Sequence, residues 1–133
     1  MNDDTSVLKK ALEDATRGLF FPSESDFPIE PITLGEGPQT PETITNTLGF
    51  EANRQVEESS LDALFEGLIE APEGASERDV ASAAQFLALK TLLADSLTEL
   101  RVLRLGAVDI DVVVVGRDAS GAWLGIKTHV VET

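Results

Sequence analysis

The sequence predicts an α+β protein, a three-layer α/β/α sandwich with a small, mainly antiparallel sheet and a C-terminal β-hairpin. Apolar residues repeat at helical spacing near the amino terminus and again before residue 99, whereas beyond residue 107 they alternate with a period of two. Val113 and Val115 occupy positions that a sheet with one solvated face would leave polar. We therefore expect helices on both faces of the sheet, within a single domain of residues 1–133.

The first expected element is an amphipathic helix that Asp4 or Thr5 can cap. Gly18 is placed to end this helix, because glycine readily adopts the left-handed conformation found after a last helical turn. The apolar residues at helical spacing are Val7, Leu8, Ala11, Leu12 and Ala15. One side of the helix should therefore pack against the rest of the protein.

Residues 20–28, FFPSESDFP, surround the polar run Ser23, Glu24, Ser25 and Asp26 with aromatic rings and prolines. A solvated loop needs no apolar anchors, so this pattern predicts a loop that is held in one conformation. The serine hydroxyls can bond the loop backbone and support a turn. The expected anchors are Phe20, Phe21 and Phe27, together with Pro22 and Pro28.

The middle of the chain predicts short and irregular elements. Residues 29–34 contain Pro31, which cannot donate to a strand ladder, so they form an edge strand at best. A loop at 35–41 should lead into a short helix at 41–49, and another short strand is expected near 54–58.

Serines mark the beginnings of the next two helices. Ser59 or Ser60 can cap a brief helix, and Ser76 with Asp79 resembles a capping box that opens the longest helix, about 77–99. The main apolar stripe of that helix is Phe86, Leu89, Leu93, Leu97 and Leu100. Further apolar residues widen the stripe, so the helix should contact more than one neighbour.

The last third of the chain predicts two strands joined by a tight turn. Residues 108–115 alternate in polarity, and the returning segment 123–131 does the same after a turn at Ser120 and Gly121. The two strands should pair as an antiparallel hairpin.

Net charge excludes some classes of partner. The chain carries a net charge of −14, and the stretch from Gly18 to Glu77 holds Arg54 as its single base. Such a surface repels the phosphates of nucleic acids and lipids and attracts cationic proteins or divalent metals. We expect no direct nucleic-acid partner and no membrane partner.

The amino terminus begins MNDD, which is acidic where a secretory signal is basic, and no apolar run approaches the ~20 residues that cross a bilayer. The chain has no cysteine, which excludes disulfides and thiolate metal sites. We therefore expect a cytoplasmic protein that packing alone stabilises.

Candidate catalytic groups are few. His129 is the only histidine, and its place beside Lys127 on a strand is typical of a surface or interlayer residue rather than a base. Asp109 and Asp111 share a strand face and could chelate a hard cation, but Arg101 and Arg104 are nearby ion partners that favour ordinary solvated positions.

Two further groups of acidic residues occur near loops and the chain end. Glu24 and Asp26 could in principle form a hydrolase acid pair, although nothing in the sequence positions a substrate for them. Glu132 and Thr133 follow the last strand and offer carboxylate and hydroxyl oxygens, the kind of ligand that magnesium accepts. A chain that simply stops at the end of its last strand accounts for the same residues.

Three segments closely resemble the cyanobacterial nuclease A inhibitor family: GLFFPSESDFPIE at 18–30, RLGAVDIDVVVVG at 104–116 and the terminal VVET. The resemblance implies an α/β/α sandwich that binds a magnesium-dependent, sugar-nonspecific endonuclease, in a 1:1 complex, and blocks its active site. It implies no enzyme activity and no cofactor of the protein's own.

The resemblance also implies which residues touch the nuclease. Glu24 and Thr133 match the family residues that reach the nuclease centre, Thr133 through a bridging Mg²⁺ of the target. Their neighbours Ser23, Ser25, Asp26 and Glu132 complete the expected partner-binding set. The family pattern has a tryptophan near the position of Gly74, which this chain lacks, and Trp123 belongs to the hairpin instead.

Two alternatives remain open from the sequence. The lost tryptophan is compatible with an acidic interaction module of the same fold that binds a different basic partner. A small metal-dependent hydrolase using Glu24, Asp26 or Asp111 is less well supported, because the chain offers no convincing nucleophile or base.

Overall fold

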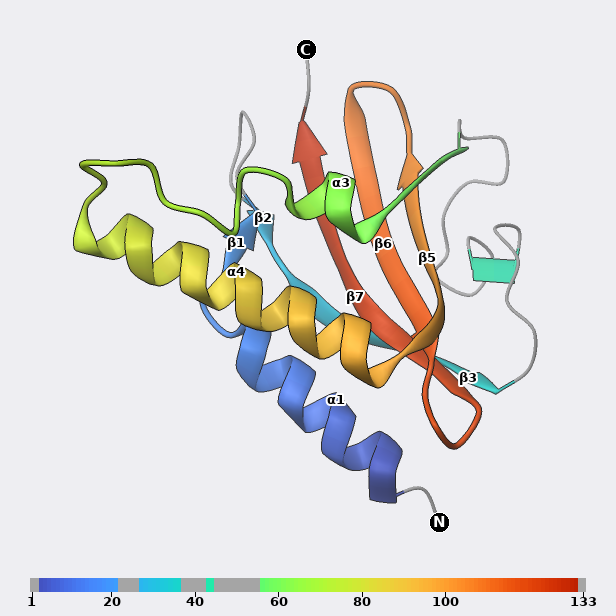
Figure 1. Ribbon diagram of the computed structural model, residues 1–133. Coiled ribbons are helices and arrows are strands. Elements are labelled where there is room, and N and C mark those ends of the chain that lie inside the picture. The colour runs from blue at the N-terminus through green and yellow to red at the C-terminus, as the bar shows by residue number, and fades with distance from the viewer. Residues whose placement is uncertain (1–2, 22–26, 37–42, 45–55, 132–133) are drawn as a thin grey trace.

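The computed structural model describes residues 3–21, 27–36, 43–44 and 56–131 (Figure 1). The helices are α1 (Asp3–Thr16), α3 (Leu61–Phe65) and α4 (Glu77–Ser96). The strands are β1 (Phe20–Phe21), β2 (Phe27–Pro28), β3 (Glu30–Glu36), β4 (Val56–Ser59), β5 (Thr98–Leu105), β6 (Asp109–Arg117) and β7 (Ala122–Val131). The α+β class is therefore confirmed.

Five of these strands form one antiparallel sheet in the order β3-β7-β6-β5-β4. The C-terminal hairpin β6–β7 is its centre, as predicted, and β3 and β4 are its edges. Pro31 lies on edge strand β3, the position in a sheet where proline is tolerated. Both short strands expected from the middle of the chain are thus confirmed.

Helices α1, α3 and α4 share one hydrophobic core with a single face of the sheet. Leu12 of α1 and Leu89 of α4 are fully buried in the same cluster as Val112 and Val114 of β6. Figure 1 shows α3 and α4 crossing in front of the strands. The apolar sides of α1 and α4 thus meet over the same strands, so the two long helices do not supply the helices expected on both faces.

The opposite face of the sheet has its own smaller core. Val113 and Val115 are fully buried there with Leu103 and Leu105, as the alternation in this region predicted. Ile44, which is also fully buried, packs on this cluster. Most of the helix predicted at 41–49 lies outside the described residues, so the third layer of the sandwich stays a prediction.

Helix α4 begins as predicted and ends earlier than predicted. The hydroxyl of Ser76 accepts a hydrogen bond from the backbone N–H of Asp79 at 3.2 Å, which caps the first turn. The helix ends at Ser96, and Leu97 and Leu100, assigned above to the helical stripe, fall in its C-cap and in β5. Strand β5 was not predicted.

Helix α3 is capped by Ser60, whose hydroxyl accepts from the N–H of Ala63 at 3.1 Å. Lys90 Nζ lies 2.8 Å from an Asp62 carboxylate oxygen and ties α3 to α4. The Lys90 ammonium, by donating to this carboxylate and attracting it, holds the pKa of Asp62 below its ordinary value.

In the described ranges, no helix combines the length and apolar character needed to cross a membrane.

Candidate functional site

Strands β1 and β2 form a small hairpin that encloses the acidic segment singled out in the sequence. Phe20 pairs with Pro28 and Phe21 with Phe27, so the register closes around residues 22–26. The backbone N–H of Ile29 donates to the carbonyl of Leu19 at 3.1 Å at the base of the hairpin. The five residues 22–26 are therefore bordered on both sides by paired strand residues.

Two of the expected aromatic anchors hold this hairpin, and the third does not. Phe21 is 9% exposed and meets Phe86 of α4 edge to face, with ring centroids 6.3 Å apart. Phe27 meets His129 of β7 in the same manner at 4.8 Å. Phe20, however, is 51% exposed, so its predicted role as an anchor is wrong. Alternation along a strand explains the difference, because neighbours point to opposite sides.

Replacing Phe21 by alanine should lower the free energy of unfolding by about 3 kcal/mol, since it removes a buried ring from the core. The matched variant Phe20→Ala should lower it by less than about 1 kcal/mol, because half of that ring is already in solvent. Urea unfolding of both variants measures the two values. Equal losses would show that Phe20 is as much a part of the core as Phe21.

The hairpin is also tied to the last strand of the sheet. The hydroxyl of Thr128 donates to the carbonyl of Pro28 at 3.0 Å, and Thr128 itself is 9% exposed. Together with the Phe27–His129 contact, this bond fixes β2 beside the C-terminal end of β7 (Figure 1). Pro28 and Thr128, which are 100 residues apart in the sequence, are thus neighbours in space.

The predicted partner-binding residues all belong to those two segments. Ser23, Glu24, Ser25 and Asp26 follow Phe21 and Pro22, while Glu132 and Thr133 follow Val131. They lie outside the described residues and stay predictions. Phe27, which directly follows Asp26, is in contact with His129, which lies three residues before Glu132.

Asp109 and Asp111 flank His129 on the neighbouring strand. Asp111 Oδ1 lies 3.0 Å from His129 Nδ1, and Asp109 Oδ1 lies 3.5 Å from Nε2. The side chain of Asp109 is 76% exposed, as expected, whereas that of Asp111 is only 24% exposed. Of the two arginines expected as ion partners, Arg101 binds Glu58 at 2.7 Å instead, and the pairing with Arg104 stays a prediction.

Sequence reasoning did not predict the contacts of His129, which it treated as an ordinary surface or interlayer residue. The β6–β7 register sets Asp111 opposite His129, and that register could have been derived from the turn at Ser120 and Gly121. Over the described ranges, no group of three or more histidine and acidic side chains is arranged to hold a metal ion.

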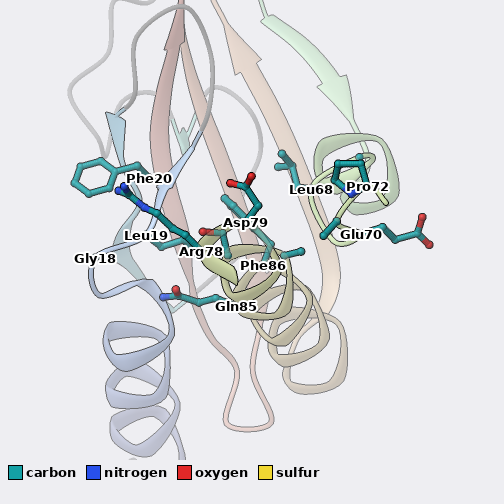
Figure 2. A pocket seen from close by; sticks show the side chains of 14 residues that line it. Gly18, Leu19, Phe20, Leu68, Glu70, Pro72, Arg78, Asp79, Gln85 and Phe86 are labelled. Atoms are coloured by element: carbon teal, nitrogen blue, oxygen red, sulfur yellow. The ribbon is translucent and has the colours of Figure 1, made fainter. Parts of the chain in front are cut away.

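A groove lies beside strand β1 of the hairpin. This groove, with a volume of about 410 Å³, is bounded by β1, by the loop after α3 and by the first half of α4. Figure 2 shows Phe20 and Arg78 on one side of it and Glu70 on the other. Gln85 fixes its floor by donating to the carbonyls of Ala15 and Arg17, both at 3.2 Å.

The loop beside this groove and the first turn of α4 are acidic. Five exposed carboxylates occur between residues 66 and 79, against the single base Arg78; they are Glu66, Glu70, Glu73, Glu77 and Asp79. Gly74 lies in this loop with φ of 83°, a conformation that residues with a side chain rarely adopt. The position where a family tryptophan was expected therefore has a backbone suited to glycine.

Comparison with protein-family models matches the chain to the nuclease A inhibitor-like protein, over residues 6–133. The match covers the hairpin, the long helix, the sheet and the C-terminal segment, which is nearly the whole chain. Comparison with curated proteins gives no match. The chain belongs to the nuclease A inhibitor-like family.

Proposed function

We propose that this protein binds a magnesium-dependent, sugar-nonspecific DNA/RNA endonuclease, in a 1:1 complex, and blocks its active site. Family membership supports a nuclease as the partner. The observation that carries the proposal furthest is the junction of β2 with β7, where Thr128 bonds Pro28 and Phe27 contacts His129. The two oxygen-rich segments, residues 22–26 and 132–133, adjoin this junction in the sequence, so that both can enter one cleft.

The inhibitory contacts follow from the chemistry of the target. A nuclease offers cationic groups and a metal ion to the phosphodiester that it cleaves. Glu24 takes the place of a substrate phosphate, flanked by Ser23, Ser25 and Asp26. Thr133, next to Glu132, supplies oxygen ligands to the nuclease's own magnesium ion. No bond is made or broken, and the protein needs no cofactor of its own.

A rigid hairpin makes this mimicry effective. Ordering a flexible side chain at an interface costs about 0.5 to 1.5 kcal/mol, and a segment that is already fixed avoids much of that cost. Phe21 in the core, Phe27 against His129 and the Thr128–Pro28 bond supply the fixing. These contacts explain why a polar acidic run is bordered by aromatic residues.

Charge should bring the two proteins together. The net charge of −14 creates a field that attracts a basic cleft, and the acidic loop at 66–79 adds to it on the hairpin's side of the molecule. Steering of this kind raises the association rate at low ionic strength and weakens as salt screens the charges.

Purified protein titrated against several magnesium-dependent endonucleases should inhibit at least one of them. The association rate should fall about tenfold or more between about 20 mM and about 500 mM salt, as expected for electrostatic steering. Stopped-flow or surface-based binding measures this rate, and substrate cleavage measures the inhibition. Failure to inhibit any non-specific endonuclease would contradict the proposal.

One observation favours a second candidate. Gly74 adopts φ of 83° where the family pattern has a tryptophan, so part of the usual interface is missing or rebuilt. An acidic interaction module of the same fold, with a different basic partner, would explain that loss. Binding of a basic protein without any effect on nuclease activity would support it.

A further inference from the structure

The groove beside strand β1 has an apolar interior. Leu19, Ala83 and Phe86 line it and are buried, and Leu68 lines it from the loop after α3. Its volume of about 410 Å³ is more than one side chain needs, because pockets of about 300 Å³ or more hold whole small molecules. Such an interior suits the hydrocarbon stem of a long side chain whose charged end stays near the surface.

Aromatic and charged side chains surround the opening of the groove. Phe20 is 51% exposed, and Glu70, Arg78 and Asp79 are exposed as well. Figure 2 shows Asp79 between Phe20 on one side and Glu70 on the other. In the part of the chain that the structure describes, neither carboxylate has an ion-pair partner, and the bond between Asp79 and Ser76 uses the backbone N–H of Asp79. Both carboxylates can therefore accept hydrogen bonds from a partner.

We infer that this groove binds an arginine side chain of the inhibited nuclease, as a second contact beside the one that Glu24 makes. The inference rests on the proposed function and deepens it, because it names a further part of the interface. Phe20 is four residues before Glu24, so at most about 14 Å of extended chain separates them. A nuclease that contacts Glu24 is therefore within reach of the groove.

Charge decides that the occupant is a cation. Residues 66–79 carry five exposed carboxylates against the single base Arg78, so a positive group is attracted to this side of the molecule and an anion is repelled. Arg78 opposes the cation, but the carboxylates outnumber it. A nuclease has such cations to offer, since enzymes that bind phosphates do so with lysine and arginine.

The shape and donors of the guanidinium group favour arginine over lysine. A guanidinium carries five N–H donors in a planar fork, which matches a carboxylate through two parallel hydrogen bonds. Its plane also stacks on an aromatic face, and Phe20 offers an exposed ring at the opening of the groove. The lysine ammonium has three donors and holds its water more strongly, so it gains less from the same surroundings.

This role also accounts for the exposure of Phe20. Strand β1 places Phe21 in the core and leaves Phe20 at the groove, and exposed aromatic residues are typical anchors of interfaces. Gln85 of α4 donates to the carbonyls of Ala15 and Arg17, which holds the end of α1 against α4. The two sides of the groove are therefore positioned before a partner arrives, which lowers the cost of ordering them.

Nitrogen-15 NMR on the free protein tests the inference without any nuclease. The probes are three blocked tripeptides with arginine, citrulline or lysine between two glycines. The arginine peptide should shift the amides of Leu68, Asp79 and Phe86 saturably, with a dissociation constant of about 10 mM, a weak affinity expected for a single side chain. Citrulline keeps the shape of arginine without its charge and should bind at least about fivefold more weakly, and lysine about threefold more weakly.

Three variants give the direction of each contribution to binding of the arginine peptide. Phe20→Ala and Glu70→Gln should each weaken it about fivefold, whereas Arg78→Gln should strengthen it about threefold, because it removes the one opposing charge. All three positions are exposed, so the variants should keep the fold. Absence of a saturable shift at the groove, or equal affinity for the arginine peptide and either of the other two, would overturn the inference.

The same variants, measured as inhibitors, separate this inference from the proposed function. Phe20→Ala and Glu70→Gln should each raise the dissociation constant for the nuclease about tenfold, and Arg78→Gln should lower it about threefold. The controls Asp95→Asn, in the last turn of α4, and Lys9→Gln, in the first half of α1, make the same changes of charge away from the groove. They should alter the constant by less than about twofold.

The outcomes are distinct. Inhibition in which the groove variants behave like their controls would overturn the groove as a contact and leave the proposed function standing. Failure to inhibit any nuclease would overturn the proposed function, and the peptide titration alone would then decide whether the groove binds arginine.

Discussion

Replacing Glu24 by alanine is expected to weaken inhibition about 100-fold, or about 3 kcal/mol, because truncating a charged hot-spot residue at the centre of an interface commonly costs about 2 kcal/mol or more. Truncation also leaves the cationic groups of the nuclease without their partner once water is excluded. The dissociation constant, measured by titration of nuclease activity, gives the loss. Thermal unfolding should show no change, since the ring contacts of Phe21 and Phe27, which hold the strands on either side of this segment, do not involve Glu24.

Asp95→Ala is the matched control for this variant. It removes the same charge from an exposed position in the last turn of α4, away from the first half of that helix, which borders the hairpin. Inhibition should change by less than about twofold, the scale of an exposed charge far from the contact. Equal effects of Glu24→Ala and Asp95→Ala would show that only total charge matters.

Deletion of Thr133 should weaken inhibition as well, and unchanged inhibition in both Glu24→Ala and the deletion would contradict the assigned contacts.

Replacing Gly125 by alanine is expected to destabilise the protein by about 4 kcal/mol or more, among the largest effects of a single substitution. An added Cβ would lie 1.8 Å from the carbonyl oxygen of Val114 and 2.8 Å from its carbonyl carbon. Gly125 pairs with Val115 at the centre of the sheet, where β7 has partners on both sides. The clash is with backbone, so a side-chain rotation cannot relieve it.

Gly18→Ala provides the comparison, because an added Cβ at Gly18 would meet nothing within 4 Å. Its only expected penalty is the left-handed backbone, φ of 70°, which costs a residue with a side chain about 1 to 2 kcal/mol. Urea unfolding followed by far-ultraviolet circular dichroism gives both values. Equal stability of the two variants would mean that β6 and β7 do not approach each other closely at Gly125.

Local patterns predicted most of the elements of this fold. The helix caps at Ser60 and Ser76 could be predicted, because a serine directly before a helical apolar repeat can accept a hydrogen bond from an N–H of the first turn. The turn at Ser120 and Gly121 was equally clear, and Gly121 has φ of 95°. Pro31 marked an edge strand because proline cannot take part in a central ladder.

Strand β5 was missed because its leucines continue the helical spacing of α4. Leu97 and Leu100 fit the stripe that contains Leu93, so periodicity alone extended the helix. The chain leaves the helix at Leu97, and Glu99 takes a positive φ of 52° at an irregularity in the β5–β6 register. Hydrogen bonding of β5 to both β4 and β6 then outweighs local helix propensity.

The arrangement of layers and the environment of His129 depend on contacts between distant residues, which local pattern does not contain. Nothing in the sequence of α1 says which face of the sheet it covers, because an amphipathic helix fits either one. The sequence likewise does not distinguish Phe20 from Phe21. Their burial differs because β1 points one side chain to solvent and the other into the core. The acidic segment itself was recognised from its resemblance to a family, and the structure explains how its two ends are held.

The most direct test of the central claim is whether the protein and nucleic acid compete for the same place on the nuclease. Inhibition should be measured at several concentrations of duplex DNA, with free magnesium held constant. We predict that the apparent inhibition constant rises in proportion to DNA concentration above the Michaelis constant, as it must when inhibitor and substrate exclude each other. An inhibition constant that stays the same at every DNA concentration would place the protein outside the active site and contradict the account.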